Sequence, residues 1–253
     1  MGQESSLVRE LDQETSNEKE KLQIEGSIKE KMSVLKSKAE QSYKSNDYET
    51  SADSYSQLLN LMTEELGLDP MSESLGPLYL AYGQSLLQIA IQKSSSELIN
   101  SSAPSIPVAL FKKEGIEIED DSGEGEQEQE VQESEEDEFE MAWEILDTAR
   151  LIFEKAESAD STAVFLMETH SLLADLSMET EAFSQAIPDL EKAISYARGS
   201  PDRVIASLYF RLGMAQEYDG RIDEAIISLK ESKRILKECN LDSLIQEIDG
   251  KVR

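Results

Sequence analysis

The sequence predicts an all-α fold, a solenoid of four helical hairpins in which the second hairpin is interrupted by a long acidic insert. Apolar residues recur at spacings of three and four from Ile28 to the end of the chain, and the alternation typical of β-strands is almost absent. Three segments, beginning at Leu35, His170 and Tyr209, can also be aligned with one another. Self-similarity of this kind indicates that one supersecondary unit is repeated along the chain.

Each aligned segment carries two small residues twelve positions apart, one on each expected helix. Antiparallel helices joined by a short turn approach closely only where side chains are small, and larger side chains then fill the remaining space. The small pairs are Ala39–Ser51, Ala174–Ala186 and Gly213–Ala225; four positions later come Tyr55, Leu190 and Leu229, and three positions after these come Leu58, Ala193 and Ser232. This twelve–four–three spacing resembles the tetratricopeptide (TPR) repeat at the positions that define it.

The same spacing sets the boundaries of the uninterrupted repeats and of the two ends of the chain. The N-terminal residues 1–27 are polar and mixed in charge, so we expect a flexible segment there. The sequence after Asn240 predicts a final helix that covers the open end of the repeat array. Within one domain over 28–253, the expected boundaries are about 29–66 for repeat 1, 161–198 for repeat 3, 201–238 for repeat 4 and 240–253 for the capping helix.

The second repeat is split in the sequence. Gly83 stands at the small position of a good first helix, but no second helix follows twelve residues later. The missing helix comes only after the acidic run, with Ala142, Leu146 and Ala149 in the small, large and small places. We therefore expect the segments Tyr79–Gln92 and Phe139–Lys155 to pack as partners in one hairpin. The expected halves of repeat 2 are about 76–93 and 139–156, and the insert is about 94–138.

The insert is strongly acidic. Fifteen Asp or Glu and no Lys or Arg lie between Glu114 and Glu140, which is about half of the net charge of −29. Few apolar residues and dense like charge predict disorder, and a long loop adds little closure entropy. The acids that we expect to contact a partner are Glu124, Glu126, Glu128, Glu130, Glu133, Glu135, Glu136, Asp137 and Glu138.

Composition excludes several classes of function. The acidic balance argues against direct binding of nucleic acid, which needs clustered Lys and Arg, and favours a basic partner. His170 stands alone on a predicted helix, without a serine–acid arrangement or a Gly-rich phosphate loop, so we expect no enzyme and no cofactor. The run EIEDDSGEGE fails the calcium-loop spacing, and the single Cys239 cannot build a thiolate metal site, so no metal is expected. No apolar stretch is long enough to span a bilayer, and we expect no association with a membrane.

An acidic tract inside the second of four TPR repeats resembles the NASP-like (SHNi-TPR) histone chaperones, specifically a fungal member. The most specific stretches are AYGQSLLQIA before the insert, MAWEILDTARLIF after it, and METHSLLADLSMETEAFSQAI in the third repeat. The resemblance implies binding of histone H3, alone or with H4, and its protection before nucleosome assembly. It also implies residence in the nucleus, with the cytoplasm as a second location. Linker histone, a histone acetyltransferase or other assembly factors, and a second copy of the chain are the further partners to consider.

The binding groove is expected on the first helices of repeats 3 and 4. Residues one and four positions after the small residue, and three before it, face the concave surface of such an array. The resemblance adds that Asp175, Glu179 and Glu181 match family positions that contact H3. Met178, Phe210 and Met214 have an alternative role in the core. The predicted groove residues are Glu168, Asp175, Met178, Glu179, Glu181, Phe210, Met214, Glu217 and Tyr218, with Ser171 beside them.

Two other binding functions compete with this reading. A co-chaperone that clamps a C-terminal carboxylate would carry Lys and Asn at set places, which here hold Lys36, Glu40, Ala81, Glu168 and Leu172. Only Lys36 fits, and two acids would repel a carboxylate. The second alternative is a general TPR scaffold for a basic protein other than a histone, and the sequence leaves this alternative open.

Overall fold

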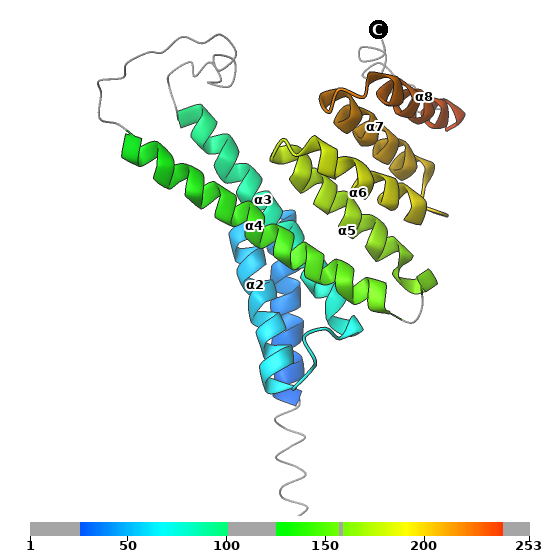
Figure 1. Cartoon of the computed structure of the whole chain (residues 1–253). Helices are drawn as coiled ribbons and strands as arrows, with labels where there is room; N and C mark the ends of the chain where they lie inside the picture. Colours follow the sequence, from blue (N-terminus) through cyan, green and yellow to red (C-terminus); the bar gives the residue numbers. More distant parts are fainter. Residues whose placement is uncertain (1–25, 101–124, 157–158, 240–253) are drawn as a thin grey trace, which may run out of the picture. The chain divides into compact units, whose positions relative to one another are not determined.

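The computed structural model describes residues 26–100, 125–156 and 159–239, and all regular structure in these residues is helical (Figure 1). The prediction of an all-α TPR fold is confirmed. The single domain expected over 28–253 is instead divided into two compact units, Met1–Pro70 and Met71–Arg253. The boundary falls in a stretch without regular helix between Leu66 and Ser72, where Gly67 has a φ of 65°. The two units are described separately.

The first unit contains one hairpin. A helix over residues 26–44 is followed by α2 (Tyr48–Asn60), which continues into a π-helical turn, η1 (Leu61–Glu65). The Asp47 side chain caps α2 by accepting a hydrogen bond from the Thr50 backbone N–H at 3.2 Å. The Ser51 hydroxyl donates to the Ala39 carbonyl at 3.0 Å. The two small residues of repeat 1 therefore mark the closest approach of its helices, as their spacing predicts.

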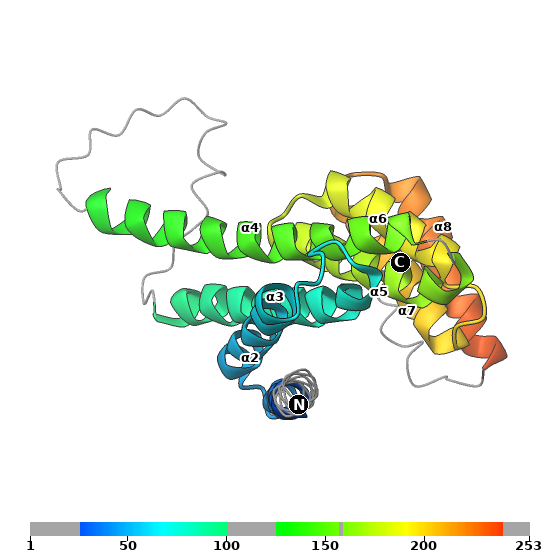
Figure 2. The same ribbon diagram turned by 90° about the horizontal axis from the view of Figure 1, so that it is seen from below.

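The second unit begins with η2 (Glu73–Leu75), α3 (Gly76–Asn100) and α4 (Gly125–Lys155). Figures 1 and 2 show α3 and α4 side by side and antiparallel. Leu80, Leu87 and Ala90 of α3 are buried in one cluster with apolar residues of α4 and α5. A Cβ added to Gly83 would lie 2.7 Å from Leu146, so this glycine permits the close approach. The interrupted-repeat interpretation predicts this pairing.

The ends of the insert differ from the prediction. Helix α3 runs on to Asn100 and α4 starts at Gly125, so residues 94–100 and 125–138 are helical, and the expectation of disorder there was wrong. Glu and Gln are good helix formers, and a segment that extends an already packed helix avoids the cost of nucleation. Lys93 of α3 forms an ion pair with Glu138 of α4 where this extension begins. Residues 101–124, including Glu124, lie outside the described residues.

Two further hairpins complete the unit, α5 (Ala159–Glu179) with α6 (Phe183–Tyr196), and α7 (Asp202–Tyr218) with α8 (Ile222–Glu238). Ala174 and Ala186 are fully buried in a cluster shared by α5, α6 and α7. A Cβ on Gly213 would lie 2.7 Å from Leu229, which repeats the contact made by Gly83. The expected flexible N-terminus and the capping helix fall on residues 1–25 and 240–253, which are outside the described residues apart from 26 and 27, where the first helix begins.

The turns of hairpins 1, 3 and 4 share one backbone feature. Asn46, Glu181 and Gly220 each have a positive φ, of 61°, 57° and 83°. Each follows the small residue of its first helix by seven positions. A left-handed residue reverses the chain after the first helix, which glycine does at no steric cost and other residues do with strain. Glu181 bears this strain in the third repeat.

Candidate functional site

The predicted groove residues lie on α5, on α7 and on the turn after α5. Arg211 of α7 reaches across to α5, where it forms an ion pair with Asp175 and donates a hydrogen bond to the Ser171 hydroxyl. These contacts show that the two first helices are neighbours. We call the set the α5–α7 surface, which comprises the nine predicted groove residues together with Ser171, Phe183 and Arg211.

Asp175 is already engaged within the chain. Burial raises the pKa of its carboxyl above the usual range, while the Arg211 guanidinium acts in the opposite direction. An incoming cation would compete with Arg211 for this carboxylate. Sequence reasoning missed Arg211, because helical spacing places it on α7 but does not reveal which acid of the neighbouring helix it meets. Asp175, proposed from the resemblance as a direct contact, therefore also holds α5 and α7 together.

Three other acids of the surface are available to a partner. Glu168, Glu179 and Glu181 are exposed, and within the described part of the chain none of them forms an ion pair. Partial burial nevertheless raises the pKa of Glu168, so its charge is less well solvated than that of a free carboxylate. A positive group placed beside these side chains would gain Coulomb energy without first breaking an internal pair.

The apolar members divide between core and surface. Met178 packs against the cluster between α5, α6 and α7, and Phe210 packs against the cluster between α7 and α8, so both serve partly as core. Met214 is half-buried. Tyr218 is 57% exposed and stacks on Phe183, with ring centroids 4.9 Å apart and planes 21° apart. Phe183 begins α6, and the sequence analysis did not predict its stacking with Tyr218. Glu217 lies on the same helix at intermediate exposure.

His170 packs inside the second unit. It is fully buried, its Nδ1 lies 2.8 Å from an Asp189 carboxylate oxygen, and its ring stacks on Tyr196 with centroids 5.9 Å apart. Among the residues that the structure describes, no cluster of His, Cys, Asp and Glu could hold a metal ion. In the same residues, no helix has both the length and the apolar character that a bilayer span requires.

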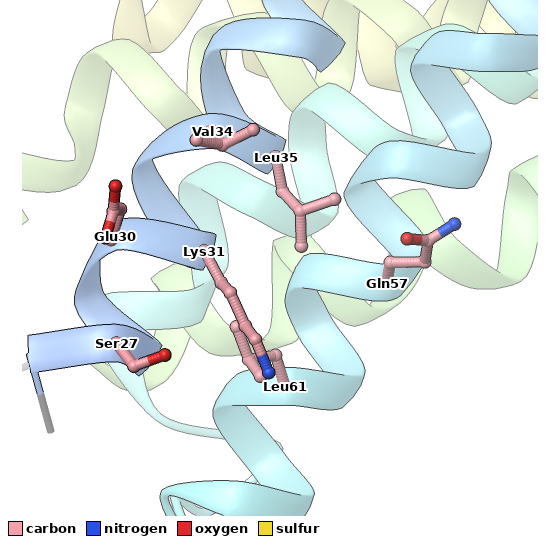
Figure 3. A pocket seen from close by; sticks show the side chains of 7 residues that line it. All are labelled: Ser27, Glu30, Lys31, Val34, Leu35, Gln57 and Leu61. Atoms are coloured by element: carbon pink, nitrogen blue, oxygen red, sulfur yellow. The ribbon is translucent and has the colours of Figure 1, made fainter. Parts of the chain in front are cut away.

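The carboxylate-clamp alternative gains nothing from the structure. Lys36, the only cation at a clamp position, lies 4.0 Å from Glu40 on its own helix. The same unit contains an open groove of about 540 Å³ between the helix over 26–44 and the end of α2 (Figure 3). Its apolar lining comes from Val34, Leu35 and Leu61, and no predicted site residue lines it.

Comparison with known proteins connects this surface to a family. A family model described as SHNi-TPR matches residues 168–195, which run from the middle of α5 through most of α6. Human nuclear autoantigenic sperm protein (NASP) is 27% identical over 116 residues, covering 44% of this chain and 15% of the human protein. The NASP-related protein sim3 of Schizosaccharomyces pombe is 27% identical over 214 residues, covering 70% of this chain and 54% of the relative. The chain is similar to the NASP-like proteins of the SHNi-TPR type.

Two further comparisons give the same similarity. Histone-binding protein N1/N2 of Xenopus laevis is 26% identical over 102 residues, covering 39% of this chain and 17% of the relative. The solved structure of the yeast histone chaperone Hif1 superposes with a TM-score of 0.61 at 14% identity, covering 90% of this chain and 95% of that one. At this identity the likeness shows the fold. The chain spans about half the length of sim3 and less than a fifth of the length of the human and Xenopus relatives.

Proposed function

We propose that this chain is a histone chaperone that binds H3, alone or as H3–H4, and shields it before nucleosome assembly in the nucleus. The observation that supports this function best is the pair of exposed acids Glu179 and Glu181 just before Phe183, whose ring stacks on Tyr218. Glu168 is a further exposed acid about three helical turns earlier on α5. A relative named as a histone-binding protein supports a histone as the basic partner. Linker histone offers the same basic chemistry and is a second candidate ligand for the surface.

The α5–α7 surface suits an amphipathic basic helix. Carboxylates attract Lys and Arg and exclude acidic ligands, while Met214 and the exposed Tyr218 ring offer adaptable apolar contact. An Arg side chain of the ligand can also lie over the Tyr218 face. In this arrangement Asp175 keeps its pair with Arg211, and the three exposed acids make the new ion pairs. Selectivity then comes from shape and apolar contact, and the charges set orientation and encounter rate.

The acidic residues before Phe139 act at longer range. Their negative field raises the local concentration of a histone and covers basic surface that would otherwise bind DNA. Replacing the Glu and Asp residues between 126 and 137 by Gln or Asn should therefore weaken binding of whole H3–H4 and spare a short H3 helix peptide. Loss of peptide binding in this variant would contradict the division between attraction and selection.

The decisive experiment compares two double variants of the full chain in titrations with H3–H4. Glu179→Lys with Glu181→Lys places two positive charges on the α5–α7 surface, and we expect affinity to fall by roughly tenfold or more. Glu65→Lys with Glu191→Lys makes the same change in charge at exposed sites elsewhere, and should have a much smaller effect. Equal losses would mean that only net charge matters.

Salt separates the histone chaperone from a general scaffold for basic proteins. At about 0.3 M salt, where the Debye length is below about 8 Å, unspecific attraction is largely screened. H3–H4 should stay bound under these conditions while an unrelated basic protein dissociates. Loss of both ligands together would favour the general scaffold.

A further inference from the structure

The outward face of α4 exposes three large apolar side chains between acids. Trp143 is 48% exposed, Met141 49% and Leu151 37%. At helical spacing, Glu140, Glu144 and Leu151 form one line along α4, with Met141 and Trp143 on either side of it. We call these five residues the α4 outer face.

The opposite side of α4 already accounts for its packing. Ala142, Leu146 and Ala149 are fully buried against α3 and α5, and Phe153 stacks on Phe165 at 5.0 Å between centroids. The buried side of α4 therefore supplies the main packing of the hairpin, and the outer face leaves a large part of three apolar side chains exposed. Burial of exposed apolar surface is favourable, so the exposed parts of three large apolar side chains on one face give a partner a reason to cover them.

The charge of the outer face indicates which partner fits. Within the described residues, the carboxylates of Glu140 and Glu144 form no ion pair, whereas Asp147 and Glu154 share Arg150 at 2.6 and 2.8 Å. The same helix continues toward its N-terminus through residues 126–138, which contain eight Asp or Glu and no Lys or Arg. A second copy of this chain, with its net charge of −29, would be repelled from such a face.

We propose that the α4 outer face is a second docking surface, with Trp143 as its anchor, for a basic amphipathic segment of the partner. The cationic side of that segment pairs with Glu140 and Glu144, and a Lys or Arg side chain lies over the indole ring. Its apolar side covers Met141 and Leu151. The proposal shares with the proposed function only the requirement that the partner is basic. It does not depend on the α5–α7 surface, because the α4 outer face lies on a different helix.

Trp143 reports directly on this face because it is the only tryptophan of the chain. Full-length protein is titrated with a synthetic Trp-free amphipathic peptide of Lys and Leu, and tryptophan emission and acrylamide quenching are recorded. We expect a blue shift and protection from the quencher. Glu140→Gln with Glu144→Gln should weaken the peptide by roughly three- to tenfold at low salt, as loss of two exposed ion pairs implies. The charge-matched control, Glu65→Gln with Glu191→Gln, should change the affinity less than twofold.

The results that overturn the proposal are equally specific. Peptide binding, measured by anisotropy of a labelled peptide, without any change at Trp143 would place the ligand elsewhere, and so would equal affinities of the two Gln pairs. A blue shift that depends on the concentration of the protein alone would assign the face to a second copy.

The Glu179→Lys, Glu181→Lys variant separates this inference from the proposed function. In that variant the Trp143 response to the peptide should persist while H3–H4 binding falls. If H3–H4 binding were unaffected by that variant and the Trp143 response persisted, only the proposed function would fail. If the Trp143 response were absent in every variant while H3–H4 still bound, only the α4 outer face would fail.

Discussion

The hairpins α3–α4 and α5–α6 have the same internal packing but entirely different connections. In α5–α6 three residues join the helices, and the backbone reverses at Glu181 with a positive φ. In α3–α4 the joining segment runs from 101 to 124, yet Gly83 and Leu146 meet as closely as Gly213 and Leu229 do in the last hairpin. The complementary helix faces, rather than the turn, therefore determine which helices pair.

Removing the large core residue tests this conclusion with the largest expected effect. Leu146 and Leu190 occupy equivalent places in the two hairpins, and both are fully buried. Leu146→Ala and Leu190→Ala should each lower the free energy of unfolding by about 3–4 kcal/mol, through lost transfer energy and the cavity left behind. Urea denaturation followed by circular dichroism measures both values. A much smaller loss for Leu146→Ala would show that the interrupted hairpin is packed more loosely.

Adding a methyl group at the close approach should have a smaller effect. The new Cβ of Gly83→Ala would lie 2.7 Å from Leu146, and that of Gly213→Ala would lie 2.7 Å from Leu229. Overpacking costs about 1–3 kcal/mol, and the better helix propensity of Ala returns up to about 1 kcal/mol. We expect a net loss of about 1 kcal/mol in each case by the same denaturation measurement. Stabilisation by Gly83→Ala alone would mean that the two contacts are not equivalent.

A substitution in the turn between α5 and α6 should increase the stability of the protein. Glu181→Gly should raise the free energy of unfolding by about 1 kcal/mol, because glycine adopts the left-handed conformation without strain. Gly220→Ala, at the equivalent turn of the last hairpin, should lower it by a similar amount. Thermal unfolding of both variants measures whether the first is stabilised and the second destabilised. If Glu181→Gly also weakened H3–H4 binding, a strained residue would be retained there for recognition.

Shortening the connection of α3–α4 should have the smallest effect. Replacing residues 101–124 by a Gly/Ser linker of half that length should change stability by less than about 1 kcal/mol, because loop-closure entropy varies with the logarithm of length. A linker of unchanged length is the control in the same denaturation experiment. A loss as large as that of Leu146→Ala would show that the segment itself holds the hairpin together.

Sequence reasoning succeeded where one periodicity governed the outcome. Two helices in close contact require small side chains at the point of contact, and Ala174, Ala186 and Gly213 occupy these points. Their spacing alone therefore predicted the hairpins. The contacts within the candidate site were harder to predict from the sequence. The contact of Arg211 with Asp175 joins helices of different repeats, and a long flexible side chain can reach several partners, which no spacing rule ranks.

The acidic segment was misjudged for a different reason. The prediction of disorder treated residues 125–138 as an isolated segment with dense like charge. In the structure they extend a helix whose remaining turns are held in place by the packing of Ala142 and Leu146. Each added residue then needs only the free energy of propagation, which Glu and Gln supply. The division into two units near Pro70 was also absent from the prediction, since the repeat register continues on both sides of it.

Because α4 is one continuous helix, binding of a cationic ligand to it can be detected by amide hydrogen exchange. A helix of 31 residues rises about 1.5 Å per residue, which makes α4 about 46 Å long. Its amide hydrogens should exchange fast toward Gly125 and slowly near Leu146, in a gradient along one rod. A cationic ligand that neutralises the fast-exchanging end would suppress fraying there and flatten the gradient without any change in the hairpin core.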